Sequence, residues 1–242
     1  MDSRTRLLLG DEAMERIAQA QVIVFGTGGV GSWCAECLLR SGIRRITLVD
    51  CDKVAPSNCN RQLMATSKTI GMVKVEALRQ RLLDIAPEAE IHALEKFFCK
   101  DNAHEFGLEG YDYIIDAIDS LRDKAELILR ATSLPASVTF ISSMGAALRI
   151  DPFKVREAEF WNVKGDALAK ALRNRFKKDK TFPSRKFRCV YSEEQPMPNK
   201  GQTTETSDTL VGSKVHVNGS ICQVTAVFGM CIASMVIKDL AL

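Results

Sequence analysis

The sequence predicts an α/β protein built on a Rossmann-like, doubly wound and mostly parallel β-sheet. Short apolar runs rich in β-branched residues begin near residues 21, 45, 90, 111 and 138, and they alternate with stretches of helical apolar spacing. Such alternation builds a parallel sheet with helices on both faces. A further strand, at residues 214–218, is expected to add an antiparallel edge.

The first predicted strand, residues 21–25, runs into the glycine-rich sequence Gly26-Thr27-Gly28-Gly29-Val30-Gly31. Residues 30–40 then have helical spacing, and the glycine at position 42 is expected to end that helix. A strand, a GxGxxG sequence and a helix in this order form the fingerprint of a dinucleotide-binding unit, whose backbone amides and helix N-terminus bind phosphate. The expected nucleotide-binding glycines are Gly26, Gly28, Gly29 and Gly31.

An acid follows the second predicted strand. Asp50 lies about 20 residues beyond the glycine sequence, where a Rossmann unit places the acceptor for ribose hydroxyls. Asp52 comes shortly after it. The alternative is that Asp50 only caps a turn into Cys51-Asp52. An acid in this place is common to NAD-binding and ATP-binding units.

The residues that come next favour ATP over NAD. A polar loop carries Asn58, Arg61 and Gln62, and Lys74 lies in the first turn of the next helical pattern. A pyrophosphate can be bound by backbone amides, whereas a reacting triphosphate concentrates negative charge that cations must neutralise. A guanidinium and an ammonium can supply that charge. The alternative for Arg61 and Lys74 is a solvated surface position.

Two acids follow another apolar run, residues 113–115. Ligands of open α/β sheets bind at the carboxyl ends of the strands, so Asp116 and Asp119 are expected to face the nucleotide. Asp119 is the expected metal residue, because Mg²⁺ usually takes one or two carboxylates together with phosphate oxygens. The alternative is that Asp119 is the N-cap of a helix that begins near Leu121.

These motifs together resemble the ThiF/MoeB/HesA adenylating superfamily, which includes the ubiquitin-activating enzymes. The resemblance spans about residues 5–147. Further on, the basic insertion near Lys177, residues 188–192 and residues 219–230 resemble the tRNA threonylcarbamoyladenosine dehydratases. The resemblance implies an enzyme that uses ATP to activate the threonyl carboxylate of a modified adenosine beside the anticodon, which then closes to a cyclic form.

The resemblance also implies roles for single residues. Asp50 would bind ribose, Arg61 and Lys74 the phosphates, and Asp119 magnesium. An arginine from the other subunit of a homodimer would complete the site, and it falls on Arg6, with Arg4 as the alternative. The whole chain, 1–242, is then a single ThiF-type domain with a nucleotide-binding half, 1–147, and a substrate and dimer half, 148–242.

The eight cysteines are scattered, and the N-terminal residues are charged rather than apolar, which indicates a reduced, cytoplasmic protein. MoeB and ThiF members carry two CxxC pairs for structural zinc, whereas here only Cys34 and Cys37 have that spacing. Four sulfur ligands are needed for a closed zinc site, so no zinc is expected and the pair is interpreted as helix packing.

Cys189 has two interpretations. A cysteine can accept an acyl group when nearby cations such as Arg188 lower the pKa of its thiol. The alternation around it instead favours a short strand with Cys189 packed inside. The surrounding residues, 177–208, contain three prolines after position 182 and are expected to form a long loop, which we expect to be a mobile lid over the adenylation site.

A basic run extends over residues 164–188, with ten Lys or Arg against two Asp. Such a run is often a solvated face. Here it includes Phe176, Phe182 and Phe187, whose rings could stack on bases exposed in a tRNA loop beside cations that bind phosphate. Residues 219–237 carry no charge and are expected to form a buried helix rather than a membrane segment.

Three other functions remain open. An NAD-dependent oxidoreductase could use the same glycine loop, but it would not need Arg61, Lys74 or Mg²⁺. Activation of a ubiquitin-like sulfur-carrier protein would need a groove for a Gly-Gly tail, and a partner protein that delivers sulfur is also open. A nucleotide-sensing protein without enzymatic activity would bind ATP but release no pyrophosphate.

Overall fold

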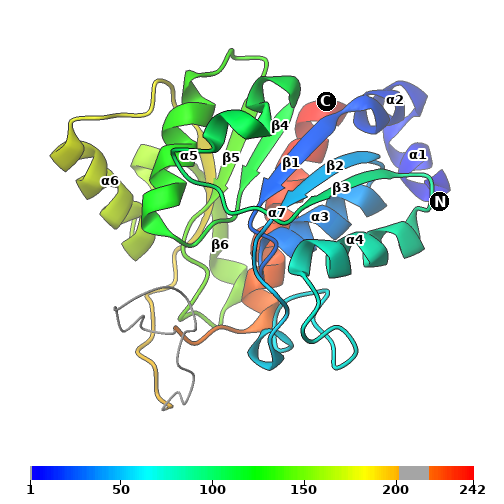
Figure 1. Cartoon of the computed structure of the whole chain (residues 1–242). Helices are drawn as coiled ribbons and strands as arrows, with labels where there is room; N and C mark the ends of the chain where they lie inside the picture. Colours follow the sequence, from blue (N-terminus) through cyan, green and yellow to red (C-terminus); the bar gives the residue numbers. More distant parts are fainter. Residues whose placement is uncertain (1, 202–217) are drawn as a thin grey trace.

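A computed structural model describes residues 2–201 and 218–242 of the chain. Its described strands form one seven-stranded sheet with helices on both faces (Figure 1). The strands are β1 Gln21–Phe25, β2 Arg45–Val49, β3 Glu90–Leu94, β4 Tyr113–Asp116, β5 Thr139–Ser143, β6 Val155–Glu159 and β7 Arg188–Ser192. Their order across the sheet is β3-β2-β1-β4-β5-β7-β6, and only the β6–β7 pair is antiparallel. The predicted fold class is confirmed.

The antiparallel edge is formed by β6, whereas the expected edge strand at residues 214–218 lies outside the described residues except for its last position. β6 alternates little in hydrophobicity because an edge strand buries little of its surface, so its residues gave no strand signal. The predicted loop over residues 177–208 is wrong at β7, which enters the sheet between β5 and β6. The lid expected from this segment falls partly on undescribed residues and stays a prediction.

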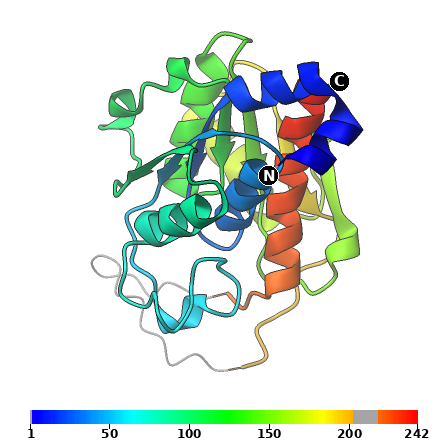
Figure 2. The same cartoon turned by 90° about the vertical axis from the view of Figure 1, so that its right-hand side faces the viewer.

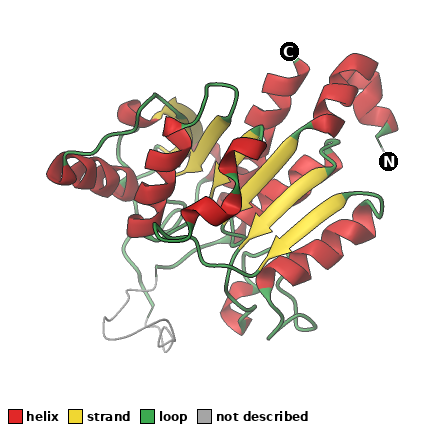
Figure 3. Cartoon of the chain, turned by 45° about the horizontal axis from the view of Figure 1, so that its top comes forward, coloured by secondary structure: helices red, strands yellow, loops and turns green. Residues whose placement is uncertain are grey.

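Seven α-helices are described, and they divide between the two faces of the sheet. They are α1 Ser3–Leu9, α2 Asp11–Gln19, α3 Gly31–Arg40, α4 Lys74–Ile85, α5 Leu121–Ser133, α6 Ala167–Asp179 and α7 Cys222–Ala241. α2, α3, α4 and α7 cover one face, and α5 and α6 cover the other (Figures 2 and 3). Short 3₁₀ turns occur at Pro56–Asn58, Ala103–Phe106, Leu108–Gly110, Pro152–Lys154 and Phe160–Asn162.

The central strands are apolar along their length because helices cover both of their faces. Alternate residues of β1 therefore enter different cores: Val22 and Val24 pack toward α3 and α7, and Ile23 and Phe25 pack toward α5. Phe25 makes edge contacts with Phe98 and Phe106, with ring centroids 5.1 and 5.3 Å apart. The two cores hold the sheet rigid behind the loops at its carboxyl edge.

α7 is long and apolar enough to cross a membrane by composition, yet half of that apolar window is buried inside the protein. The helix crosses α3 closely at Gly229, where a Cβ atom would lie 2.8 Å from the backbone nitrogen of Cys34. Phe228 and Ile232 are fully buried in the same contact. The position of α7 agrees with the expected buried helix, which packs across the first nucleotide-binding helix.

Candidate nucleotide site

Parallel strands bring their following loops to one edge of the sheet, and the glycine sequence lies at the centre of that edge. Gly26 has φ +84°, and a Cβ atom there would lie 2.6 Å from the carbonyl oxygen of Ala117, so only glycine fits. A Cβ atom on Gly31 would collide with the carbonyl oxygen of Gly26. These two glycines let the loop turn tightly from β1 into α3, as the fingerprint predicts.

The space above Gly28 is open. The nearest atom to an added Cβ there is Nε2 of Gln62, 3.8 Å away. A Cβ atom on Gly29 would meet Thr225 of α7 at 3.2 Å and Cγ of Arg61 at 3.3 Å. The backbone at Gly28 can therefore be approached closely by a ligand, with Gln62 and Arg61 beside it, as phosphate binding requires.

The carboxylate of Asp50 holds the glycine loop. Its Oδ2 accepts hydrogen bonds from the backbone nitrogen of Thr27, at 2.8 Å, and from Oγ1 of Thr27, at 3.1 Å. Its Oδ1 accepts from the backbone nitrogen of Asp52 at 2.9 Å. Asp50 therefore caps the turn into Asp52, and its ribose role stays a prediction.

Lys74 begins α4, and its side chain is only 8% exposed, so the interpretation as a solvated surface charge is wrong. Its Nζ lies 2.7 Å from Oδ2 of Asp52, whose side chain is 51% exposed. The backbone nitrogen of Lys74 also donates to the carbonyl oxygen of Asp52. A cation and its carboxylate partner are thus fixed next to the turn that follows β2.

The loop between β2 and α4 positions the other polar residues. Nη1 of Arg61 donates to the carbonyl oxygen of Ser57, at 3.0 Å, and Oδ1 of Asn58 accepts from the backbone nitrogen of Ala55, at 3.0 Å. Asn58 therefore shapes this loop from a buried position. Gln62 is also buried, and its Oε1 has no hydrogen-bond partner among the described residues. A buried polar atom beside the open Gly28 fits a site that a polar ligand completes.

Trp33 is a positioning residue that sequence reasoning missed. Its indole Nε1, on the first turn of α3, donates to the carbonyl oxygen of Arg61 at 3.0 Å. This bond ties the loop that carries Arg61 to the helix that begins at the glycine sequence. The helical spacing of residues 30–40 predicted only that Trp33 packs in the core. The hydrogen-bond partner of its indole N–H depends on how the chain folds, so spacing cannot predict it.

Asp116 and Asp119 have different environments, which corrects the expectation that both face the nucleotide. Asp116 is fully buried, and its Oδ2 lies 2.9 Å from Nζ of the fully buried Lys124. Asp119 is exposed and has no hydrogen bond or ion pair with any part of the chain that the structure describes. Ser120, rather than Asp119, is the N-cap of α5, so the capping interpretation of Asp119 is wrong.

Arg6 lies apart from the other predicted site residues. Arg6 forms an ion pair with Asp11, and Asp2, just before α1, bonds to Arg44 at the amino end of β2. Figure 1 shows α1 beside that end of the sheet, whereas the glycine loop lies at the carboxyl end. Arg6 therefore does not join the site of its own chain. Arg4, the alternative, is exposed on the same helix.

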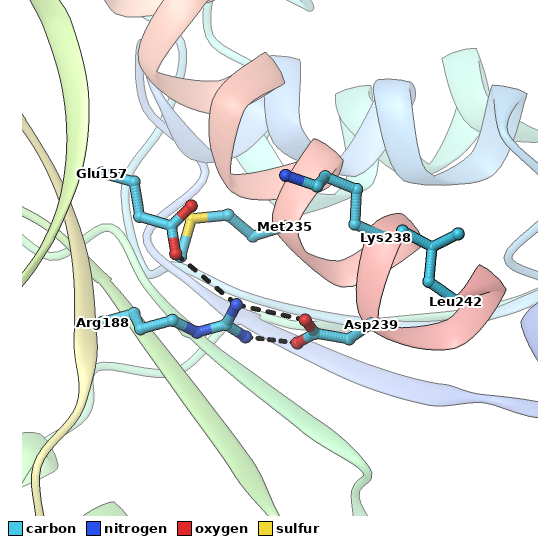
Figure 4. Close-up of a pocket in the computed structure, with 6 residues that line it drawn as sticks. All are labelled: Glu157, Arg188, Met235, Lys238, Asp239 and Leu242. Carbon is cyan, nitrogen blue, oxygen red and sulfur yellow. Dashed lines mark hydrogen bonds and ion pairs between the residues drawn. The ribbon is translucent and has the colours of Figure 1, made fainter.

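Cys189 is fully buried in β7, and burial raises the pKa of its thiol well above the usual range. Arg188 does not activate it, because its guanidinium pairs with Asp239 and, at 3.5 Å, with Glu157. Arg188, Asp239 and Glu157 line a 370 Å³ pocket with Met235, Lys238 and Leu242 (Figure 4). Arg188 is the first residue of β7, at the end of the sheet opposite the glycine loop. The packing interpretation of Cys189 is confirmed, and the interpretation as a nucleophile is wrong.

The basic run is only partly available to a ligand. Arg173 and Arg185 donate to backbone carbonyls, and Arg175 and Arg188 form ion pairs. The lysines are exposed and have no ion pair with the described residues: Lys164, Lys170, Lys177, Lys178, Lys180 and Lys186. The expected stacking rings are wrong for Phe176 and Phe187, which are core residues, whereas Phe182 is 53% exposed and neighbours Trp161.

Cys34 is buried in the core beside α7, as the packing interpretation predicted. Over residues 2–201 and 218–242, no group of three or more His, Cys, Asp or Glu side chains is placed to hold a metal ion. A single carboxylate such as Asp119 is not such a group. Any metal at this edge would need further ligands from a bound phosphate.

The sheet and the glycine loop together define a Rossmann-like protein with a dinucleotide-type phosphate-binding turn. The chain belongs to the ThiF family, whose model matches residues 3–241. It is 38% identical over 195 residues to a Bacillus subtilis protein named tRNA threonylcarbamoyladenosine dehydratase, covering 81% of this chain and 75% of that one. The resemblance stated from the sequence is confirmed.

Two further relatives are informative. The Escherichia coli tRNA threonylcarbamoyladenosine dehydratase is 35% identical over 98% of this chain and 91% of its own length. Its structures with ATP and with AMP superpose with a TM-score of 0.83, covering 98% of this chain and 92% of that one. A sulfur carrier protein adenylyltransferase of Thermus thermophilus is 33% identical, but over only 46% of this chain and 41% of its own.

Proposed function

We propose that this protein is an ATP-dependent tRNA threonylcarbamoyladenosine dehydratase. The buried Lys74 beside Asp52, at the edge where Gly28 is open to a ligand, is the observation that carries the ATP part of the proposal. The similarity to dehydratases over nearly the whole chain supports the tRNA part. Residues 1–147 would bind the nucleotide, and residues 148–242 would bind the substrate and contact the partner subunit.

Each part of the site has a task in this proposal. Gly26 and Gly31 allow the tight turn that presents the amides of Gly28 and Gly29 and the N-terminus of α3 to phosphate oxygens, and Asp50 and Asp52 lie on the ribose side. Arg61 and Lys74 neutralise the charge that moves onto the departing pyrophosphate. Gln62 offers its Oε1, which has no hydrogen-bond partner within the described part of the chain, and Asn58 holds the loop that carries Arg61 and Gln62. Asp119, exposed at the same edge, would hold Mg²⁺, which would shield the phosphate charge.

The chemistry needs no strongly tuned acid or base for its first step. A threonyl carboxylate oxygen attacks the α-phosphorus of ATP, the bond to the β-phosphate breaks, and pyrophosphate leaves. An internal nucleophile of the modified adenosine then attacks the activated carbonyl, loses its proton, and AMP leaves with the former carboxylate oxygen. The sum is loss of water from the nucleoside. Fixed cations contribute most to the rate of the first step, because negative charge moves onto the departing pyrophosphate in that step.

A homodimer is part of the proposal. Arg6 lies on α1, which has no buried residue, and Leu7 and Leu8 on the same helix are 88% and 81% exposed. Exposed apolar side chains of this size are typical of a contact surface. Because α1 lies at the amino end of its own sheet, Arg6 can complete a phosphate site only in a neighbouring subunit. A second chain would thus supply a catalytic cation.

The exposed lysines of α6 and the residues after it would bind tRNA phosphates, and Phe182 with Trp161 offers exposed rings beside them. We propose a cytoplasmic protein that needs neither zinc nor a membrane. A sulfur-transfer partner remains an alternative partner, supported by the shorter similarity to a sulfur-carrier adenylyltransferase.

The proposal is tested by incubating the protein with ATP, Mg²⁺ and tRNA that carries threonylcarbamoyladenosine, followed by nucleoside mass spectrometry. Loss of one water from the modified nucleoside, with one pyrophosphate released per event, is the expected result. The Lys74→Met protein is the matched negative control. Hydride transfer with NAD, or adenylation of a sulfur carrier with a Gly-Gly tail but no change in the nucleoside, would overturn the proposal.

A further inference from the structure

A fully buried ion pair lies directly behind the nucleotide edge. Nζ of Lys124, on the first turn of α5, is 2.9 Å from Oδ2 of Asp116 at the end of β4, and both side chains are 0% exposed. Moving two charges out of water costs several kcal/mol for each ion, which their attraction does not always return. A buried ion pair is therefore weak evidence that the two residues stabilise the fold. The other contacts of this pair indicate a second role.

The pair closes one short turn from both sides. Nζ of Lys124 also donates to the carbonyl oxygen of Ile118 at 2.9 Å, and Oδ1 of Asp116 accepts from the backbone nitrogen of Ile118 at 3.1 Å. Oγ of Ser142, on β5, donates to Oδ2 of Asp116 at 2.7 Å. The turn over residues 116–118 is therefore held by a cation, a carboxylate and the neighbouring strand.

The turn over residues 116–118 packs against Gly26 and leads directly into Asp119. The backbone nitrogen of Ala117 donates to the carbonyl oxygen of Phe25 at 2.8 Å, and the Ala117 carbonyl occupies the space where Gly26 would carry a Cβ atom. The next residue after the turn is Asp119, whose own side chain has no partner among the described residues. The position of the glycine turn and that of the Asp119 carboxylate thus depend on the same short segment.

We propose that Lys124 is a positioning residue of the nucleotide site: through Asp116 and Ile118 it fixes the turn that backs Gly26 and carries Asp119. The inference rests on the proposed ATP-dependent function. Lys124 does not touch the nucleotide, because its ammonium is enclosed behind the turn. Its effect is on geometry, and misplacement of a site by about 1 Å can lower a rate by roughly a hundredfold.

The test compares two double variants that each remove one ion pair with a buried carboxylate. Asp116→Asn with Lys124→Met removes the pair behind the site without leaving a lone charge. Glu36→Gln with Arg81→Met is the control, because the Glu36 side chain is only 8% exposed, pairs with Arg81 at 2.6 Å and with Arg40 at 2.8 Å, and links α3 to α4 away from the glycine loop. Melting temperature, ATP affinity by calorimetry without metal, and pyrophosphate release at saturating ATP are measured for both.

The expected result is a loss of pyrophosphate release of tenfold or more in the Asp116/Lys124 variant, with weaker ATP binding, while the control variant keeps both. Equal losses in the two variants, or none in the first, would overturn the proposal. If the double variant does not fold, Ser142→Ala removes only the bond to Asp116, and a folded Ser142→Ala protein with unchanged turnover would also overturn it.

A magnesium titration separates this inference from the proposed function. Asp119→Asn is expected to raise the Mg²⁺ concentration needed for half-maximal activity, and the Asp116/Lys124 variant is expected to raise it in the same direction. If Asp119→Asn leaves the titration unchanged, the metal role of Asp119 fails, while the Lys124 proposal is still decided by ATP affinity and turnover. If wild-type protein releases no pyrophosphate, the proposed function fails, and metal-free ATP affinity alone decides Lys124.

Discussion

Nζ of Lys74 lies 2.7 Å from Oδ2 of Asp52, and the two partners differ sharply in exposure, 8% for the lysine side chain and 51% for the carboxylate. The lysine is held in place by α4, whereas the carboxylate can be solvated. A triphosphate that enters beside Gly28 would therefore gain a cation that is already oriented. Preorganised charge of this kind costs no rearrangement at the moment of reaction.

Lys74→Met is expected to lower pyrophosphate release by on the order of a hundredfold, because it removes a cation that stabilises the charge moving onto phosphate. Its stability should change little, since methionine keeps most of the buried stem and Asp52 can be solvated. The rate of pyrophosphate release tests the first expectation, and the melting temperature tests the second. Lys53→Met, at an exposed lysine on the same loop, is the control. Near-normal turnover in Lys74→Met would mean that the site is misplaced.

Arg6→Ala is expected to be inactive, and mixing it with inactive Lys74→Met protein should restore part of the activity. A mixed dimer holds one site with an intact lysine and an intact arginine from the neighbouring chain. The measurement is pyrophosphate release after mixing, with subunit exchange followed by differently tagged chains. Arg4→Ala is the matched control on the same helix. If exchange occurs without recovery of activity, Arg6 does not act across subunits.

Reversal of two exposed lysines, Lys177→Glu with Lys178→Glu, is expected to weaken tRNA binding and leave ATP binding unchanged. Each lost phosphate contact should reduce the slope of log affinity against log salt by about one unit. Filter binding over a salt series measures the slope. Lys100→Glu with Lys238→Glu makes the same change in net charge elsewhere. An equal effect in both variants would show that only overall charge matters.

Cys189→Ala is expected to keep its turnover. Burial raises the pKa of the Cys189 thiol well above its usual range, so the thiol stays protonated and unreactive at neutral pH. Iodoacetamide labelling followed by peptide mass spectrometry should modify the exposed Cys59 and leave Cys189 unmodified in the folded protein. A folded Cys189→Ala protein that still releases pyrophosphate but no longer dehydrates the nucleoside would restore the nucleophile interpretation.

The sequence alone determined the features that depend on local spacing. The runs at β1, β2 and β3 begin where the structure has them, and β4 and β5 begin within two residues of the expected positions. The glycine fingerprint also predicted the turn from β1 into α3. In this turn the backbone passes so close to Gly26 and Gly31 that neither position can carry a Cβ atom. The order of strand ends placed Asp50 and Lys74 at one edge, since parallel strands all end on the same side.

Only the tertiary structure decided which charges are buried and which end of the sheet each occupies. Asp116 and Asp119 follow the same strand, yet Lys124 neutralises one and leaves the other exposed. Hydrophobic periodicity cannot report such a pairing, because a lysine is buried only when a partner from another element meets it. The same reason applies to Arg6, whose distance from the glycine loop depends on where α1 packs, and to Gln62, which lies beside Gly28 only once the loop closes over α3.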